Sequence, residues 1–276
     1  QQLNLIRRRI ERGDFAGAER LLRALPRRDG VPMDASDLLV ADAMLRCCLN
    51  RGALAQAVVP LLEVTRGLRA GLTTAWEPIV DVDTGWCAWL PPLPPDNLAR
   101  LRLEHDLRRY QQDADASIAP LVADWLAIAS GQVGQLEGSD LLTTVARALY
   151  GEQAVRQRAR QSLEAMLSDA EPDQEGWIRF AIGTSLLCES GRGRQRSGVA
   201  ELAWLPATHA EANPLLTGWA LATLAAHLEQ DDQANTAQVI RQRLAMQYPR
   251  HPALIDEGSW APCLRDLRQE EEEASP

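Results

Sequence analysis

The stretch Arg12-Gly13-Asp14-Phe15-Ala16-Gly17-Ala18 decides the fold of this chain, because it has the pattern of an elbow between two antiparallel helices. Gly13 can end a first helix in the left-handed conformation, and Asp14 can cap the helix that follows. Ala18 is small, as expected where two helices approach closely just past their elbow. Leucines continue on the helical face of Ala18, at Leu21, Leu22 and Leu25. Residues 1–12 and the stretch up to Leu25 are therefore predicted to form a helix hairpin.

The same pattern recurs along the chain, with varying quality. Further elbows are expected at Gly52, near Asp113, and at Gly151, Gly193 and Asp232. The steps between them are 39, 61, 38, 42 and 39 residues. An internal period in this range is typical of stacked helix hairpins. The chain is therefore predicted to be an all-α solenoid of about six stacked antiparallel hairpins.

These elbows resemble those of the tetratricopeptide repeat family, which places a Gly-Asp-aromatic turn between two helices and a small residue early in the second. Residues 12–25 match this pattern well, and residues 51–64 and 228–249 match it moderately. The spacing exceeds the 34 residues of that family, and the aromatic of the turn is present only as Phe15; HEAT-like helix pairs would give a similar period. The resemblance implies a right-handed superhelix with a concave groove that binds peptides or other proteins.

One of the steps between elbows is longer than the others, and its extra residues lie in the segment 69–97. This segment holds five of the 16 prolines and three of the 8 tryptophans of the chain. A long loop without a helix of its own is often functional, and exposed tryptophans are strong interface anchors. The candidate partner-binding residues are Trp76, Trp86, Trp89, Pro92 and Pro95. The alternative is that the tryptophans fold back and fill a gap in the stack.

Local patterns divide the chain into four parts. Residues 1–68 should form two hairpins, residues 69–97 the insertion, residues 98–265 the remaining hairpins of the same solenoid, and residues 266–276 an acidic disordered tail. Within the insertion we expect a short β-hairpin around residues 83–85 and polyproline II over residues 90–95. Asp81-x-Asp83-x-Gly85 begins like a calcium loop, but it lacks the later ligands, and a turn is expected instead.

Composition limits the partners. The net charge is −9, which disfavours nucleic acid because binding there depends on neutralising phosphates. All 29 basic residues are arginine, as expected from a bacterial-like, GC-rich coding bias, and the absence of lysine excludes Schiff-base chemistry and a P-loop. No metal or cofactor motif is present, so none is predicted. The remaining expectation is a protein partner.

Five cysteines, two of them adjacent, predict neither a disulfide framework nor a zinc site. Cys47, Cys48 and Cys188 lie in apolar stretches and are expected to act as small core residues. Free thiols favour a reducing compartment such as the cytoplasm. The first residue is not Met, so we expect a processed or excised piece, and a periplasmic or membrane-tethered protein remains an alternative.

Arginines give two further candidate features. Arg192, Arg194 and Arg196 lie at one elbow and could contact an anion, although a solvated turn explains them as well. A second run, on a predicted helix, is explained by i,i+4 ion pairs with Glu152 and Glu164; it comprises Arg156, Arg158 and Arg160.

The function predicted from these observations is a non-catalytic protein-interaction scaffold or assembly subunit that uses the solenoid groove, the insertion or both. The alternative from another class is a helical-toroid enzyme or small-ligand binder. That alternative needs convergent polar groups near Trp177, His209 and Trp219.

Overall fold

The computed structural model describes residues 2–25, 33–74, 76–87, 89–90, 97–136, 138–249 and 251–254. Within these ranges the protein has twelve α-helices, two short 3-10 helices and no strand, which confirms the all-α class. The chain divides into two compact units, Gln1–Ser130 and Gly131–Pro276. The division falls within residues 98–265, the stretch predicted to continue one solenoid. The predicted acidic tail, residues 266–276, lies outside the described ranges.

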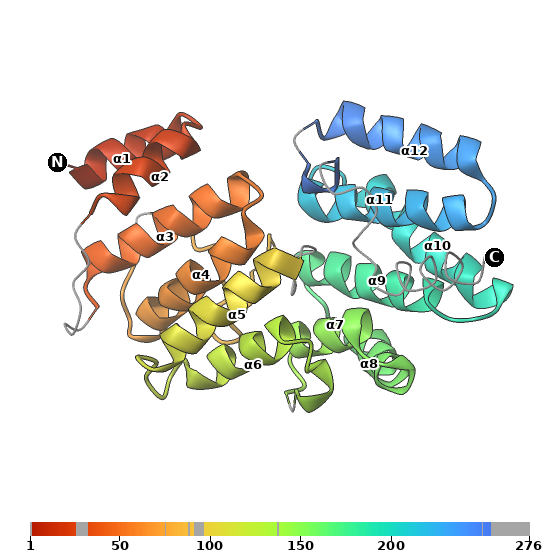
Figure 1. Cartoon of the computed structure of the whole chain (residues 1–276), viewed down its shortest axis with the longest axis horizontal. Coiled ribbons are helices and arrows are strands. Elements are labelled where there is room, and N and C mark those ends of the chain that lie inside the picture. Colours follow the sequence, from red (N-terminus) through yellow and green to blue (C-terminus); the bar gives the residue numbers. More distant parts are fainter. Residues whose placement is uncertain are drawn as a thin grey trace. The chain divides into compact units, whose positions relative to one another are not determined.

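The first unit contains three consecutive helix hairpins (Figure 1). Their helices are α1 (Gln2–Glu11), α2 (Phe15–Arg23), α3 (Ala35–Asn50), α4 (Leu54–Arg69), α5 (Asn97–Gln111) and α6 (Ala119–Ala129). The two helices of each hairpin pack against each other, and α2–α3 and α4–α5 contacts join neighbouring hairpins. The first helices α1 and α3 also pack together.

The second unit also contains three hairpins. Its elements are η1 (Val133–Gln135), α7 (Leu141–Tyr150), α8 (Gln153–Met166), α9 (Pro172–Leu187), α10 (Arg192–Thr208), α11 (Pro214–Gln230), α12 (Ala234–Gln247) and η2 (Pro252–Leu254). Each helix packs on the next, and α9 packs on both α7 and α11. Contacts between consecutive helices, and between the first helices of neighbouring hairpins, are consistent with a helical repeat.

The first elbow has the predicted geometry. Gly13 has a φ of 74°, in the left-handed region, and the Asp14 carboxylate caps α2 by accepting a 3.0 Å hydrogen bond from the Gly17 N–H. Ala18 is fully buried where α2 meets its neighbours. Asp232, at the last elbow, has a φ of 56°, so it takes the role that glycine has at the first.

Local residues determine several helix ends. Asp34 caps α3 by forming a reciprocal capping box with Asp37. Pro60 lies inside α4, which begins at Leu54. The elbow between α9 and α10 is at Gly191, with a φ of 119°, whereas Gly193 is already helical.

Hairpins α9–α10 and α11–α12 share a motif that the elbow pattern does not reveal. Pro-x-x-x-Gly-Trp opens both first helices, at residues 172–177 and 214–219, an offset of 42 residues. A histidine follows each second helix with the same offset, at His209 and His251. The two hairpins therefore repeat both in sequence and in structure.

The structure shows why these residue types recur. The ring nitrogen Nε2 of His251 lies 2.7 Å from the Leu215 carbonyl, and its ring packs edge-on against Trp219 at 5.6 Å. A Cβ on Gly218 would lie 2.4 Å from the His251 ring, so glycine is required for this approach. Trp177 and Trp219 are fully buried, with ring centroids 6.2 Å apart, and join the two hairpins in one core.

Candidate functional site

The insertion, predicted as the binding element, is anchored to the first unit by α3. Arg46 donates to the Glu77 carbonyl at 2.6 Å, and its guanidinium carbon lies 5.3 Å from the Trp76 ring centroid. Asp42 is buried; it accepts from Arg46 Nε at 2.9 Å and from the Thr74 hydroxyl. A buried carboxylate with two partners holds this part of the insertion in place.

A second arginine anchors the following turn. Arg69, the last residue of α4, donates to the carbonyls of Val82 at 2.9 Å and Asp83 at 2.7 Å. Its remaining terminal nitrogen donates to the Ser117 carbonyl at 2.6 Å, just before α6. One guanidinium thus joins the insertion to two hairpins of the first unit.

The predicted β-hairpin around residues 83–85 is wrong, because no strand forms there. The Asp81 N–H donates to the Trp86 carbonyl at 2.8 Å, and the Gly85 N–H donates back to the Asp81 carbonyl at 2.8 Å. Gly85 has a φ of 67°, and a Cβ there would lie 2.3 Å from a Leu121 methyl carbon. The segment is a tight turn that packs on α6.

The candidate tryptophans differ in exposure. Trp86 is 6% exposed, and Trp76 is partly buried against the apolar cluster of the first two hairpins. Trp89 is 37% exposed. Pro92 and Pro95 lie outside the described residues. Trp76 and Trp86 thus have the packing expected if the insertion folds back on the helices, and a binding role for these residues stays a prediction.

Replacing Arg69 by Ala should loosen the turn without unfolding the helices. The variant loses three charged hydrogen bonds at an exposed site, so we expect a loss of about 1–2 kcal/mol. Hydrogen exchange of residues 80–87, followed by mass spectrometry, should quicken by about fivefold to thirtyfold, the factor that corresponds to this loss. Arg102→Ala on the exposed surface of α5 is the matched control. Equal exchange in both variants would contradict a clamping role.

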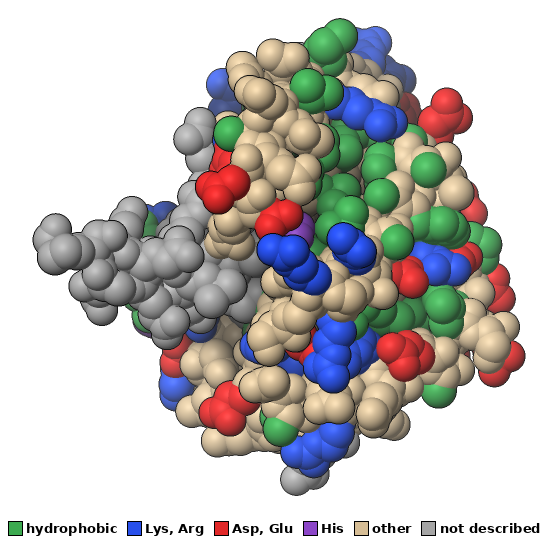
Figure 2. All heavy atoms as spheres, turned by 90° about the vertical axis from the view of Figure 1, so that its right-hand side faces the viewer, with side chains coloured by type: hydrophobic (Ala, Val, Ile, Leu, Met, Phe, Trp, Pro, Cys, Tyr) green, Lys and Arg blue, Asp and Glu red, His purple; other side chains and the backbone are tan. Residues whose placement is uncertain are grey.

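Of the arginines predicted to bind an anion, Arg194 already has a partner. It pairs with Glu189, which is 4% exposed and also pairs with Arg160 of α8. Arg192 and Arg196 are exposed. On the face shown in Figure 2, arginine and acidic side chains are interspersed. Glu189 thus already neutralises the middle arginine of the predicted anion contact.

The alternative prediction of an enzyme requires convergent polar groups near Trp177, His209 and Trp219. These three residues form part of a packed core. His209 is buried, its Nε2 lies 2.8 Å from the Pro172 carbonyl, and its ring packs at a tilt against Trp204, with the ring centroids 4.8 Å apart. Within the described part of the chain, no group of three His, Cys, Asp or Glu side chains could hold a metal ion.

The cysteine prediction is partly wrong. Cys47 and Cys48 are buried free thiols, and burial raises the pKa of Cys47 to about 12 and that of Cys48 to about 11. Cys188 is disulfide-bonded, so it does not support the expectation of free thiols. Cys87, in the insertion, is a buried free thiol as well.

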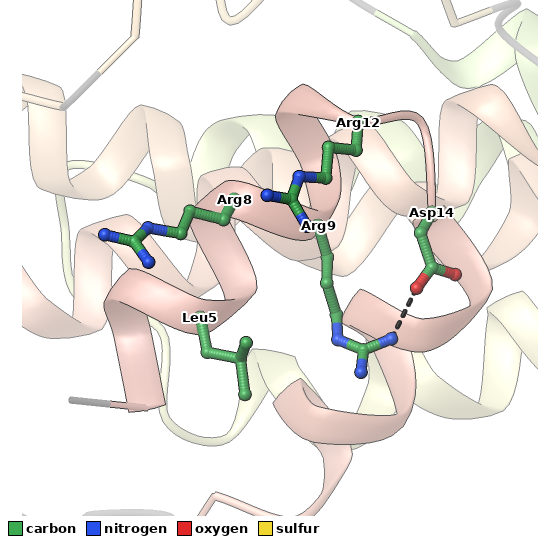
Figure 3. Close-up of a pocket in the computed structure, with 5 residues that line it drawn as sticks. All are labelled: Leu5, Arg8, Arg9, Arg12 and Asp14. Carbon is green, nitrogen blue, oxygen red and sulfur yellow. Dashed lines mark hydrogen bonds and ion pairs between the residues drawn. The ribbon is translucent and has the colours of Figure 1, made fainter.

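A pocket that no sequence motif indicates lies on the first hairpin (Figure 3). It has a volume of about 260 Å³ and is lined by Leu5, Arg8, Arg9, Arg12 and Asp14. The three arginines come from α1 and the elbow, where the Arg12 N–H still bonds to the carbonyls of Arg8 and Arg9. The backbone therefore keeps its helical hydrogen bonds up to Arg12, and the three arginine side chains project from neighbouring positions on one helical surface.

Only one of these arginines has an acidic partner among the described residues. Arg9 reaches toward Asp14 and pairs with its carboxylate, as the dashed line in Figure 3 marks. Arg8 and Arg12 are exposed and form no ion pair in the described part of the chain. Leu5, one turn before Arg8, is 45% exposed. The pocket thus combines an apolar side chain with two uncompensated positive charges.

Asp14 is fixed in this pocket from two sides. The hydrogen bond from the Gly17 N–H lowers the pKa of its carboxyl group, and the Arg9 guanidinium lowers it further. A Cβ on Gly17 would lie 2.3 Å from both Arg9 Nη1 and Asp14 Oδ2. Glycine at this position therefore leaves room for the ion pair to lie across α2.

A charge count by segment would have revealed this pocket in the sequence. Residues 2–25 contain six arginines and three acidic side chains, a net charge of +3 within a chain of −9. The overall net charge conceals this asymmetry. Arg7 differs from its neighbours because it pairs with Glu11 at 2.8 Å. Among the described residues of this hairpin, the exposed arginines without an ion pair are Arg8, Arg12 and, on α2, Arg20.

Comparisons with protein-family models, curated proteins and solved structures gave no match to this chain, so the tetratricopeptide resemblance stays a prediction. None of the helices within the described ranges has the length and apolarity needed to cross a membrane.

Proposed function

We propose that this chain is a non-catalytic protein-interaction scaffold that binds another protein through its first hairpin. The observation that carries the proposal is the pair Arg8 and Arg12, which have no acidic partner among the described residues, beside the exposed Leu5. Like charges one helical turn apart destabilise a helix by a few tenths of a kcal/mol, roughly 0.2–0.5. A partner that supplies negative charge relieves this repulsion, and Leu5 adds an apolar contact.

The architecture supports the same proposal. Helix hairpins that pack only on their neighbours expose long helix faces, which suit the binding of proteins and peptides. The insertion is less suited to be the main contact, because Trp76 and Trp86 pack against the first unit. A right-handed superhelical groove, as the tetratricopeptide resemblance implies, would add surface to the same interface.

The test is capture with the purified chain as bait, followed by reconstitution with the purified candidate partner. We expect an Arg8→Gln/Arg12→Gln double variant to weaken binding of that partner by at least about fivefold, because it loses two charge contacts. Glutamine keeps the helix propensity of the site. Arg7→Gln, on the same helix but paired with Glu11, is the matched control. Equal affinity of all three proteins for the partner would contradict binding through the first hairpin.

A further inference from the structure

We propose that the partner segment is an acidic peptide with two carboxylates about one helical turn apart and an apolar side chain beside them. This inference rests on the proposed function and names the class of partner for the same pocket.

The ion pairs within the pocket determine how many negative charges the ligand should carry. Three guanidinium groups line the pocket, and Asp14 neutralises the one on Arg9. Arg8 and Arg12 remain, so the pocket has two positive charges to offer. Guanidinium forks bind carboxylates in a planar, bidentate geometry, and two such contacts fix the direction of a peptide as well as its charge.

Helix geometry determines the spacing of the two carboxylates in the ligand. Residues four apart on a helix have Cβ atoms about 5–6 Å apart. Two glutamates at i and i+4 of a helical peptide match Arg8 and Arg12 at this spacing. Leu5 lies three residues before Arg8 and is 45% exposed, so an apolar residue three positions before the first glutamate can contact it.

Asp14 acts as an internal competitor for the ligand. Its carboxylate pairs with the Arg9 guanidinium, which could otherwise bind a third carboxylate of the ligand. Replacing Asp14 by Asn removes the negative charge but retains a side-chain oxygen that can cap α2. The variant should therefore offer three positive charges on an unchanged helix, and we expect it to bind the acidic peptide more tightly than the natural chain.

The experiment uses a fluorescein-labelled ten-residue peptide with one leucine and glutamates three and seven positions after it. Affinity is measured by fluorescence anisotropy at low salt, with a peptide that has glutamine at both glutamate positions as the matched ligand. We expect the glutamate peptide to bind at least about fivefold more tightly than the glutamine peptide, and Arg8→Gln/Arg12→Gln to abolish that difference. Arg7→Gln should stay within about twofold of the natural chain, and Asp14→Asn should bind about twofold to fivefold more tightly. Raising the salt concentration should weaken binding, because the contacts are exposed.

Two outcomes would overturn the inference. One is equal affinity for the glutamate and glutamine peptides. The other is binding of a matched phosphoserine peptide without binding of the glutamate peptide, which would assign the pocket to phosphorylated partners. If the glutamate peptide fails but a purified partner still loses affinity in the double variant, the scaffold proposal stands and the acidic class of partner falls. Circular dichroism of every variant confirms that helix content is unchanged.

Discussion

Replacing Glu189 by Ala should destabilise the second unit by about 3–5 kcal/mol, because it leaves a buried guanidinium without its partner. Glu189 is 4% exposed and Arg160, on α8, is 8% exposed. The carboxylate pairs with Arg160 and with Arg194 of α10, so one side chain at the end of α9 joins three helices. Urea unfolding, followed by hydrogen exchange of the α8–α10 peptides, measures the loss.

Two variants separate the buried charge from other effects. Glu164 also lies near Arg160, at 3.8 Å, but its side chain is 55% exposed, so Glu164→Ala should cost less than about 1 kcal/mol. Arg160→Leu combined with Glu189→Ala removes both buried charges and should recover much of the stability. A Glu189→Ala variant as stable as Glu164→Ala would contradict the structural role of this network.

The same network gives a pH dependence. Burial alone would raise the pKa of Glu189, but hydrogen bonds and charges from Arg160 and Arg194 outweigh it and lower the pKa below the usual glutamate value of 4.5. The unfolded state therefore takes up the proton at a higher pH than the folded state. The contribution of Glu189 is complete above about pH 4.5 and is lost as the pH falls through the folded pKa. Glu189→Gln should flatten this part of the acid-unfolding profile.

The local parts of this fold were predictable from the sequence, because each depends on a few neighbouring residues. Gly13, Gly52 and Asp232 have the positive φ angles that their place at an elbow requires, and Asp14 caps α2 through a group three residues away. The prediction of i,i+4 pairs was right for Arg160 and Glu164. It missed Glu189, which lies 29 residues from Arg160 and meets it only after α8 and α9 have packed.

Tertiary contacts also explain the errors in the insertion. The Asp-Thr-Gly sequence forms a turn as expected, but the carbonyls of Val82 and Asp83 accept from Arg69 and not from a partner strand. Packing on the first two hairpins partly buries Trp76, which its position in a proline-rich loop does not reveal. The arginine pocket was missed for another reason: its signal is a charge imbalance over one hairpin and not a motif.

The second large effect is expected at Trp219, the tryptophan of the repeated Gly-Trp pair on α11. Trp219→Ala should destabilise the second unit by about 3–5 kcal/mol, since it removes a fully buried side chain from a core that relaxes only in part. Trp89→Ala, at a tryptophan that is 37% exposed in the first unit, is the matched control and should cost less than about 1 kcal/mol. Urea unfolding of each variant, with hydrogen exchange of the α9–α12 peptides, compares the two losses.

Gly218→Ala tests the same core from the opposite direction, by adding one carbon atom. The new Cβ would lie 2.4 Å from His251, whose ring is held by the Leu215 carbonyl at 2.7 Å and by the Ala253 N–H at 3.1 Å. A ring fixed on both sides has to break a hydrogen bond to move away, so we expect a loss of about 1–3 kcal/mol. At Gly176 the equivalent Cβ would lie 3.2 Å from His209, and Gly176→Ala should therefore cost less. If Gly218→Ala were no more destabilising than Gly176→Ala, the close contact between His251 and Gly218 would not explain why the motif has glycine at this position.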